Sequence, residues 1–315
     1  MPQVTTFGLH IVDVLGRPVT RIPPGQEVEI IDEIAITVAG TAAATAVDLA
    51  RLGHDVATVG ALGRDALGAF LRTTMAQDGV DCSGLRIVDG AQTSATILPI
   101  RPDGGRPPLH VVGASALLTE DMVPWDVVAR SEVFHMGGTG LLPALDGAPT
   151  ARILERAKRL GLTTTMDFIP TADPAFPDQL AAALPFVDHL LPNDADSLTV
   201  TGAGSLEEAA RWFHERGAGC CVITTGGDGV SLFPRDGDPV VLPAYEVDVV
   251  DTTGCGDAFT AGYVSGLLEG LTPAEAADLG CATGSLLATG LGSQAGLHDR
   301  AAVDRFIDTH HRKAA

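Results

Sequence analysis

The most chemically suggestive stretch of the chain runs from Val249 to Phe259, with the sequence VVDTTGCGDAF. Gly254 and Gly256 let the backbone approach a ligand closely, because they have no side chain. If a helix begins here, its first free N–H groups and the positive end of its dipole attract an anion. Asp257 stands beside this predicted anion site, where a carboxylate can accept the proton of an alcohol. These residue types at this spacing predict phosphoryl transfer.

The flanking segments predict a strand, a turn and a helix. Residues 240–250 are rich in valine and favour a strand, and residues 258–268 are small or apolar up to the stop signal at Gly270. The alternative interpretation is purely structural, because an aspartate in the first turn of a helix is usually a capping or dipole residue. By itself the turn does not decide between a phosphate site and an ordinary helix start.

The composition limits the partners of the protein. The chain has 315 residues, 40 of them acidic and 20 basic, and its net charge of −20 argues against nucleic acid or an anionic membrane as a partner. No stretch has the roughly 20 apolar residues of a membrane helix, and Met1–His10 lacks the pattern of a secretory signal. Five cysteines without metal-binding spacing predict reduced thiols in a cytoplasmic protein.

Strand-like and helix-like segments alternate along most of the chain. From Val133 onward the pattern predicts a mostly parallel sheet covered by helices on both faces, an α/β fold. Two earlier β-rich segments, about residues 14–37 and 92–113, have no helix to cover them, and the second is expected to contain a hairpin. We expect both segments to form one small sheet that projects from the core. The tail, residues 310–315, is expected to be frayed.

The segment Asp251–Phe259 resembles the C-terminal signature of the ribokinase-like (PfkB) carbohydrate kinase family, D-T-x-G-[AC]-G-D-x-F, at every fixed position. Residues 38–53 are similar to the N-terminal glycine segment of that family, and residues 59–68 match its next block. The resemblance extends from residue 8 to residue 296. It implies a single kinase domain over residues 1–315, with a Rossmann-like core and the two β-rich segments as a lid over the sugar.

The resemblance also implies roles for individual residues. The implied base is Asp257, and the implied anion hole consists of the amides of Gly254, Cys255 and Gly256. The implied acceptor-binding residues are Asp13, Gly40, Thr41 and Ala44. The implied nucleotide-binding residues are Asn193, Thr224, Gly226 and Gly229. Asp196 replaces the glutamate with which the family organises Mg²⁺ through water. A monovalent cation such as K⁺ can be held in the family near Asp251 and Thr253.

Three positions depart from the ribokinase-type members of the family. Ile11, Thr41 and Ala44 stand where those enzymes have asparagine, lysine and asparagine. A site without these polar groups cannot form hydrogen bonds with the corresponding sugar hydroxyls. We therefore expect an acceptor other than ribose, with an apolar or aromatic part or with fewer hydroxyls. Other side chains that could hold the acceptor, or simply be bonded within the fold, are His10, His110 and His135.

The expected function is an ATP-dependent kinase that phosphorylates a primary hydroxyl of a sugar or a sugar-bearing small molecule, with Mg²⁺. A nucleoside kinase of the adenosine type is the main alternative, and a non-catalytic nucleotide- or sugar-binding protein on the same fold is a further one. The signature favours catalysis, because a binding protein has no need of Asp257. Phosphorylated sugars are disfavoured because few cations are available: Arg17, Arg21 and Arg106. The apolar residues of 28–36 and 93–112 would allow a homodimer through the lid.

Overall fold

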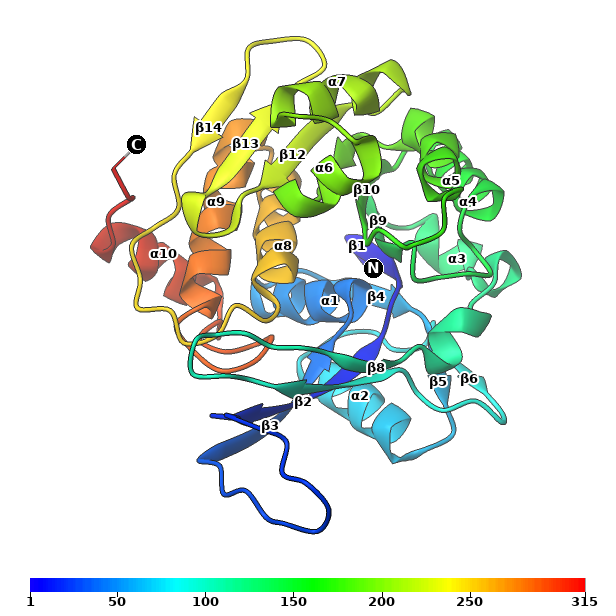
Figure 1. Ribbon diagram of the computed structural model, residues 1–315. Coiled ribbons are helices and arrows are strands. Elements are labelled where there is room, and N and C mark those ends of the chain that lie inside the picture. The colour runs from blue at the N-terminus through cyan, green and yellow to red at the C-terminus, as the bar shows by residue number, and fades with distance from the viewer. Residues whose placement is uncertain (315) are drawn as a thin grey trace.

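The computed structural model describes residues 1–314, and its largest element is an eight-stranded sheet with the order β14-β13-β12-β11-β10-β9-β1-β4 (Figure 1). The strands from β12 to β4 in this order run parallel, and β13 and β14 form an antiparallel edge. The mostly parallel sheet predicted from the sequence is therefore confirmed. Its strands are β1 Val4–Gly8, β4 Val56–Val59, β9 Val133–Thr139, β10 Thr163–Phe168, β11 His189–Leu190, β12 Cys220–Thr224, β13 Val230–Phe233 and β14 Val240–Leu242.

Helices cover both faces of this sheet and enclose two cores. The helices are α1 Thr41–Arg51, α2 Ala66–Gln77, α3 Trp125–Val128, α4 Ala148–Arg159, α5 Phe176–Ala183, α6 Asp194–Thr201, α7 Leu206–Glu215, α8 Cys255–Leu268, α9 Pro273–Leu287 and α10 Arg300–Thr309. Short 3₁₀ turns are η1 Gly113–Leu117, η2 Glu120–Met122, η3 Leu184–Phe186 and η4 Gly226–Asp228. In β12, Cys221 and Ile223 join the core under α4, α5 and α7, whereas Cys220 and Val222 join the core under α1, α8 and α9. Successive residues of a strand point to opposite faces, so a central strand such as β12 contributes apolar side chains to both cores.

The lid is a separate mixed sheet with the order β3-β2-β7-β8 (Figure 1). Its strands are β2 Ile11–Arg17, β3 Glu33–Ala39, β7 Ala95–Pro99 and β8 Leu109–Val111. The expected hairpin is present as the antiparallel pair β7–β8, and the parallel pair β2–β7 joins it to β3. A further two-stranded sheet consists of β5 Ala61–Gly63 and β6 Arg86–Val88. None of the helices in residues 1–314 has the length and apolar character needed to cross a membrane.

Two predicted strands are shorter than the sequence indicated. The strand expected over 240–250 ends at Leu242, because Pro243 has no N–H to continue the ladder. The alternating run 28–36 enters a strand only at Glu33. Its earlier apolar residues are exposed rather than packed on a sheet, so alternation alone did not make them a strand.

The tail is bound to the body of the protein, in contrast to the frayed end that we expected. Glu246 donates its backbone N–H to the carbonyl of His311 at 2.9 Å, and Lys313 donates its backbone N–H to the carbonyl of Ala244 at 2.9 Å. Residue 315 lies outside the described residues. Residues 311–313 thus pair with the segment that follows β14.

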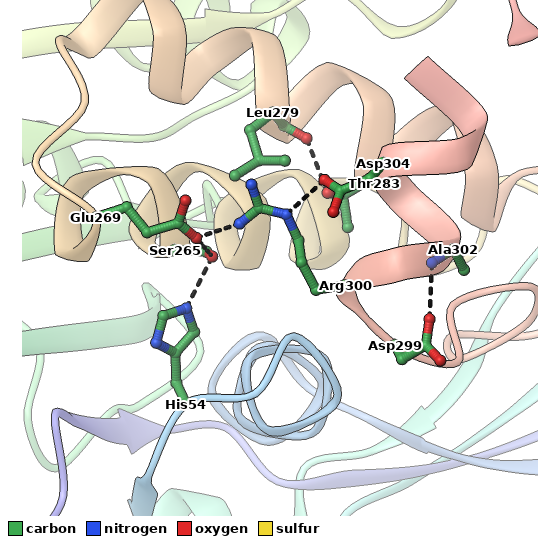
Figure 2. Close-up of polar contacts among 9 residues, drawn as sticks. All are labelled: His54, Ser265, Glu269, Leu279, Thr283, Asp299, Arg300, Ala302 and Asp304. Carbon is green, nitrogen blue, oxygen red and sulfur yellow. Dashed lines mark hydrogen bonds and ion pairs between the residues drawn. The ribbon is translucent and has the colours of Figure 1, made fainter. Parts of the chain in front are cut away.

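A polar cluster fastens α10 to the helices beside it (Figure 2). Arg300, at the start of α10, contacts Glu269 at the end of α8 and donates to Asp304 at 2.8 Å. Ser265 donates to Glu269 at 3.2 Å and lies 2.8 Å from Nε2 of His54. These contacts fasten the start of α10 to the end of α8.

Candidate active site

The glycine turn before α8 is rigidly defined. Gly254 has a left-handed backbone with a φ of 80°, and a Cβ there would lie 2.7 Å from Cα of Ser293, so both the backbone angle and the packing require glycine. At Gly256 a Cβ would meet nothing within 4 Å, which leaves open space in front of the helix. α8 begins at Cys255 rather than at the predicted Ala258. The residues of the predicted anion hole thus lie at the N-terminus of this helix, where N–H groups without an intrahelical partner occur, and the N–H of Cys255 donates to the carbonyl of Thr252 at 3.3 Å.

The carboxylate of Asp251 holds this turn in place. Its Oδ1 accepts hydrogen bonds from the backbone N–H (3.0 Å) and the hydroxyl (2.8 Å) of Thr253, and its Oδ2 accepts one from the N–H of Gly292 (3.0 Å). Arg106, from the connection between β7 and β8, donates to Asp251 at 3.4 Å and to the Thr253 hydroxyl. The two residues predicted to hold a monovalent cation thus already contact a guanidinium group.

A cavity of about 340 Å³ lies between the lid and the start of α8. The structure brings together here Asp13, Gly40, Thr41, Gly254 and Asp257, all of which were selected from the sequence. Ala44 does not line the cavity and is fully buried within α1. The apolar part of the lining comes from Leu9, Ile11, Leu98, Pro108 and Ile169. The cavity is therefore polar at one side and apolar elsewhere.

A row of polar residues crosses the lid above this cavity. Asp13 lies opposite Thr37 on one side and opposite Thr96 on the other, and His110 is next to Thr96 in the following strand. Nδ1 of His110 lies 3.1 Å from the Thr96 hydroxyl. Burial raises the pKa of Asp13 to about 6, although hydrogen bonding to Thr96 and the charge of Arg106 oppose the shift.

Asp257 lies in the first turn of α8 and lines the same cavity. Burial raises the pKa of its carboxyl to about 8, and the negative charges of Asp167 and Asp13 add to the shift. A carboxylate with a pKa near the working pH combines a useful ionised fraction with the basicity needed to take a proton from an alcohol. The site therefore gives Asp257 the proton affinity that a general base needs.

Asp167 is a candidate functional residue that the sequence analysis did not select. It lies in β10 near the carboxyl end of the strand and is buried. Its Oδ1 accepts the N–H of Gly138 at 2.5 Å, and its Oδ2 lies 3.6 Å from Nε2 of His135. The signal available in the sequence was its position at the end of a predicted parallel strand, where ligands of open α/β sheets bind.

The histidines singled out from the sequence divide into two groups. His10 is fully buried, with Nε2 at 2.9 Å from the Thr58 hydroxyl, and burial lowers its pKa to about 4. His135 is also fully buried, with Nδ1 at 2.9 Å from the Thr165 hydroxyl. Neither ring lines the acceptor cavity, so the ordinary structural interpretation holds for both. His110 alone of the three lies in the lid.

A second cavity, of about 400 Å³, lies on the other side of the glycine turn. All four residues predicted to bind the nucleotide line it: Asn193, Thr224, Gly226 and Gly229. Cys255 and Gly256 line it as well, so the turn borders both cavities. Apolar lining comes from Val247, Val249, Phe259, Cys281 and Ala288. A cavity with glycine turns at one side and apolar residues at another suits a ligand that is both anionic and partly apolar.

Asn193 and Asp196 form a hydrogen-bonded pair at the start of α6, a helix that the sequence analysis did not predict. Oδ1 of Asn193 accepts the N–H of Asp196 at 2.7 Å, and Nδ2 donates to its carboxylate at 2.6 Å. Burial raises the pKa of Asp196, and the charges of Asp167 and Asp194 add to the shift. Such crowded oxygen donors fit Mg²⁺, since a cation would relieve their repulsion. No cluster of three or more His, Cys, Asp or Glu side chains placed to hold a metal ion occurs in residues 1–314.

The match to a family model decides the identity of the fold and the class of enzyme. The model described as pfkB family carbohydrate kinase matches residues 1–300. The chain belongs to this family. This PfkB kinase is 28% identical to the ribokinase of Haemophilus influenzae over 280 residues, or 87% of this chain and 88% of the relative. It is 30% identical to the aminoimidazole riboside kinase of Salmonella typhimurium over 295 residues, or 86% and 88%.

The fold of this PfkB kinase is shared with solved structures. A candidate ribokinase II from E. coli, solved in complex with ATP and Mg²⁺, superposes with a TM-score of 0.85 at 21% identity, covering 98% of this chain and 100% of that one. The predicted ribokinase-like α/β fold with a small-sheet lid is confirmed. The prediction of a carbohydrate kinase is confirmed by the family match.

Replacing Asp167 should change the pH dependence of this PfkB kinase. The charge of Asp167 raises the pKa of Asp257, so Asp167→Asn should lower that pKa and leave more of Asp257 ionised at acidic pH. If ionised Asp257 accepts the proton, the acidic limb of kcat/KM should move to lower pH by roughly half a unit to one unit. The measurement is a pH series of kcat/KM for the acceptor.

Asp178→Asn, at an exposed position in α5, is the matched control and should leave the limb where it is. A limb that stayed unchanged in Asp167→Asn, or moved to higher pH, would contradict the electrostatic coupling.

Proposed function

We propose that this protein is an ATP-dependent kinase that transfers the γ-phosphate to a primary hydroxyl of a sugar or of a sugar-bearing small molecule. The observation that carries the proposal is the position of the glycine turn between two cavities. Gly254 and Asp257 line the cavity under the lid, whereas Cys255 and Gly256 line the cavity beside β12. A phosphoryl group that moves from one cavity to the other would pass directly in front of the helix start.

In the proposed reaction, Asp257 accepts the proton of the acceptor hydroxyl as that oxygen attacks. Its raised pKa makes it basic enough for this role, and Asp13 orients the acceptor by accepting hydrogen bonds from other hydroxyls. The acceptor then lies between the polar row of the lid and the start of α8. Positioning of this kind accounts for much of the catalysis in phosphoryl transfer, where little covalent chemistry falls to the protein.

Negative charge that develops on the transferring group would be stabilised by the turn and by one cation. The N–H groups at residues 254–256 and the dipole of α8 favour an anion at this point. Arg106 lines both cavities and so adds a positive charge at their junction. Arg17 and Arg21 do not contribute, because they pair with Glu33, Glu27 and Glu29 instead.

ATP and Mg²⁺ are proposed because the E. coli structure with this fold holds both. Asn193, which lines the cavity, and Asp196, which is hydrogen-bonded to it, would hold Mg²⁺ through water, and Thr224, Gly226 and Gly229 would face the nucleotide. When bound, Mg²⁺ neutralises phosphate charge. The residues that line the cavity would hold the nucleotide beside the glycine turn.

The acceptor cavity favours a molecule with an apolar part. Ile11 lines the cavity at a point where only a polar residue could form a hydrogen bond with a sugar hydroxyl. Further apolar lining comes from Leu9, Leu98 and Ile169. A nucleoside kinase therefore remains the second candidate, and the aminoimidazole riboside kinase among the relatives supports it. A non-catalytic binding protein is disfavoured, because Asp257 lines the acceptor cavity beside the glycine turn, where a binding protein has no need of a proton acceptor.

We further propose one kinase domain over residues 1–315, with residues of about 14–37 and 92–113 as its lid, working in the cytoplasm and pairing through the lid. All five cysteines are free, as a reducing compartment requires.

The outer face of the lid carries exposed Ile34, Ile36, Ile97 and Leu109. An apolar patch of this kind is typical of an interface. Light scattering that gave only the monomer mass would refute the pairing.

The direct test of the function is a comparison of Asp257→Asn with Asp13→Ala. Asp257→Asn keeps the size of the side chain and removes the base, so kcat should fall by roughly 10²–10⁴-fold with the fold intact. Asp13→Ala should raise KM for the acceptor and leave the affinity for ATP nearly unchanged. Steady-state kinetics and ATP titrations distinguish the two effects.

Near-normal turnover of Asp257→Asn would refute the assignment of the base. Equal loss of acceptor and ATP affinity in Asp13→Ala would indicate that this residue only supports the structure.

The acceptor cavity should use ribose poorly. Burying a ribose hydroxyl against Ile11 without a partner costs roughly 1–3 kcal/mol, so kcat/KM should be higher for acceptors with an apolar or aromatic part. The measurement compares ribose, fructose and a set of nucleosides at saturating MgATP. Ribose as the best substrate would contradict this interpretation of the cavity and leave the kinase assignment intact.

Activity should not depend on a monovalent cation. Arg106 already supplies a positive charge at Asp251, and both oxygens of that carboxylate accept hydrogen bonds from the protein. Turnover in K⁺ and in tetramethylammonium salts of equal ionic strength should therefore agree. Strong activation by K⁺ would restore the cation site that the family resemblance implies at Asp251 and Thr253.

A further inference from the structure

The nucleotide cavity contains few positive charges. Among its lining residues, within the described part of the chain, the cations are Arg106 and Lys313. The whole sequence has only two lysines, Lys158 and Lys313. Lys158 does not line this cavity and pairs with Asp188 at 2.6 Å. In a protein with a net charge of −20, a lysine at a cavity for an anionic ligand is a specific feature rather than part of a basic surface.

The tail that carries Lys313 is held by several contacts. Arg312 forms an antiparallel bridge with Tyr245, and its guanidinium lies over the tyrosine ring, 4.5 Å from the centroid. The same guanidinium contacts the carbonyl of Pro243 and the carboxylate of Asp278 in α9. The tail therefore follows the chain segment after β14 along one wall of the cavity.

α10 directs the tail to this wall. Its first residue, Arg300, is fixed by Glu269 and Asp304 (Figure 2), and near its end Phe306 packs against the rings of Tyr245 and His310, at 5.4 and 4.1 Å between centroids. Figure 1 shows the C-terminal segment beside the long connection that follows β14. Anchors at both ends of α10 thus limit where residues 311–313 can lie.

The ammonium group of Lys313 lies at the glycine turn that borders the cavity. Its Nζ donates to the carbonyl of Gly227 at 2.7 Å, within the turn Gly226–Asp228. An ammonium group has three N–H donors, so this bond leaves two for a ligand. Gly226 and Gly227 also line the cavity, which puts the charge of Lys313 and two backbone segments without side chains at one side of it.

We infer that Lys313 is a nucleotide-binding residue, and that its ammonium group pairs with the polyphosphate of the bound nucleotide. The inference rests on the proposed function, since it takes the cavity as a nucleotide site. It adds that the C-terminal segment contributes to that site through Lys313, which lines the cavity. The polyphosphate is the only part of a nucleotide with negative charge, and Lys313 is a cation that no carboxylate contacts within the ion pairs of the described residues.

The test is the affinity of full-length variants for ADP and for adenosine, measured by calorimetry. Lys313→Met keeps the length of the side chain and removes the charge, so ADP should bind about 3- to 30-fold more weakly, the range for a partly exposed charge-assisted contact. Adenosine, which has no phosphate, should bind with unchanged affinity. Lys313→Arg should recover most of the ADP affinity, and Lys158→Met, the matched control, should bind both ligands as the wild type does.

A second experiment compares the chemical reactivity of the two lysines. Amine acetylation with and without MgADP, read by mass spectrometry, should show that the nucleotide protects Lys313 and leaves Lys158 unaffected. Unchanged ADP affinity in Lys313→Met, or an equal loss for adenosine, would overturn the inference and leave the proposed kinase intact. Wild-type protein that bound no adenine nucleotide would overturn the proposed function and the inference together.

Discussion

The carboxylate of Asp251 is the contact on which the arrangement of the site depends. It accepts hydrogen bonds from Thr253 in the glycine turn and from Gly292 in the loop after α9, and it meets Arg106 from the lid. A buried carboxylate needs such partners, because an unpaired buried charge is costly. The contacts that satisfy Asp251 therefore also hold three segments, remote from one another in the sequence, at one point. These contacts therefore determine the position of the first turn of α8 relative to the lid.

The two cavities on either side of that turn differ in their electrostatics. Under the lid, burial is the main cause that raises the pKa of Asp13 and of Asp257, and at Asp257 the charges of Asp167 and Asp13 add to the shift. The other cavity receives its positive charge from Arg106 and Lys313, which come from the lid and from the tail. A strongly acidic protein can in this way supply a basic carboxylate to one ligand and cations to another, because the start of α8 separates them.

Local patterns predicted the parts of the structure that depend on local sequence. The helix after the signature, the parallel sheet and the β7–β8 hairpin all follow from periodicity and turn residues. The role of Asp167 was not predictable in this way, since its effect on the pKa of Asp257 arises only when β10 and α8 meet in the fold.

The prediction of a frayed tail was wrong for a related reason. Residues 310–314 carry no strand pattern, and their structure comes from contacts with residues distant in the sequence, such as the pairing with Ala244 and Glu246. Ala44 illustrates the converse case, because a sequence match located it in α1 without revealing that it is fully buried and does not line the cavity.

The four strands of the lid serve two surfaces at once. Asp13 and Thr96 line the acceptor cavity, whereas Ile36 and Ile97, in the adjacent cross-strand row, are exposed on the outside. Since successive residues of a strand point to opposite sides, inserting or deleting a single residue in β2 ahead of Asp13 would turn Asp13 away from the cavity and out of register with Thr96 in β7. A point substitution at a cavity-facing position leaves the backbone ladder and the outer row unchanged. Over the divergence of such enzymes, the length of the lid strands should therefore be far more constrained than the side chains that select the acceptor.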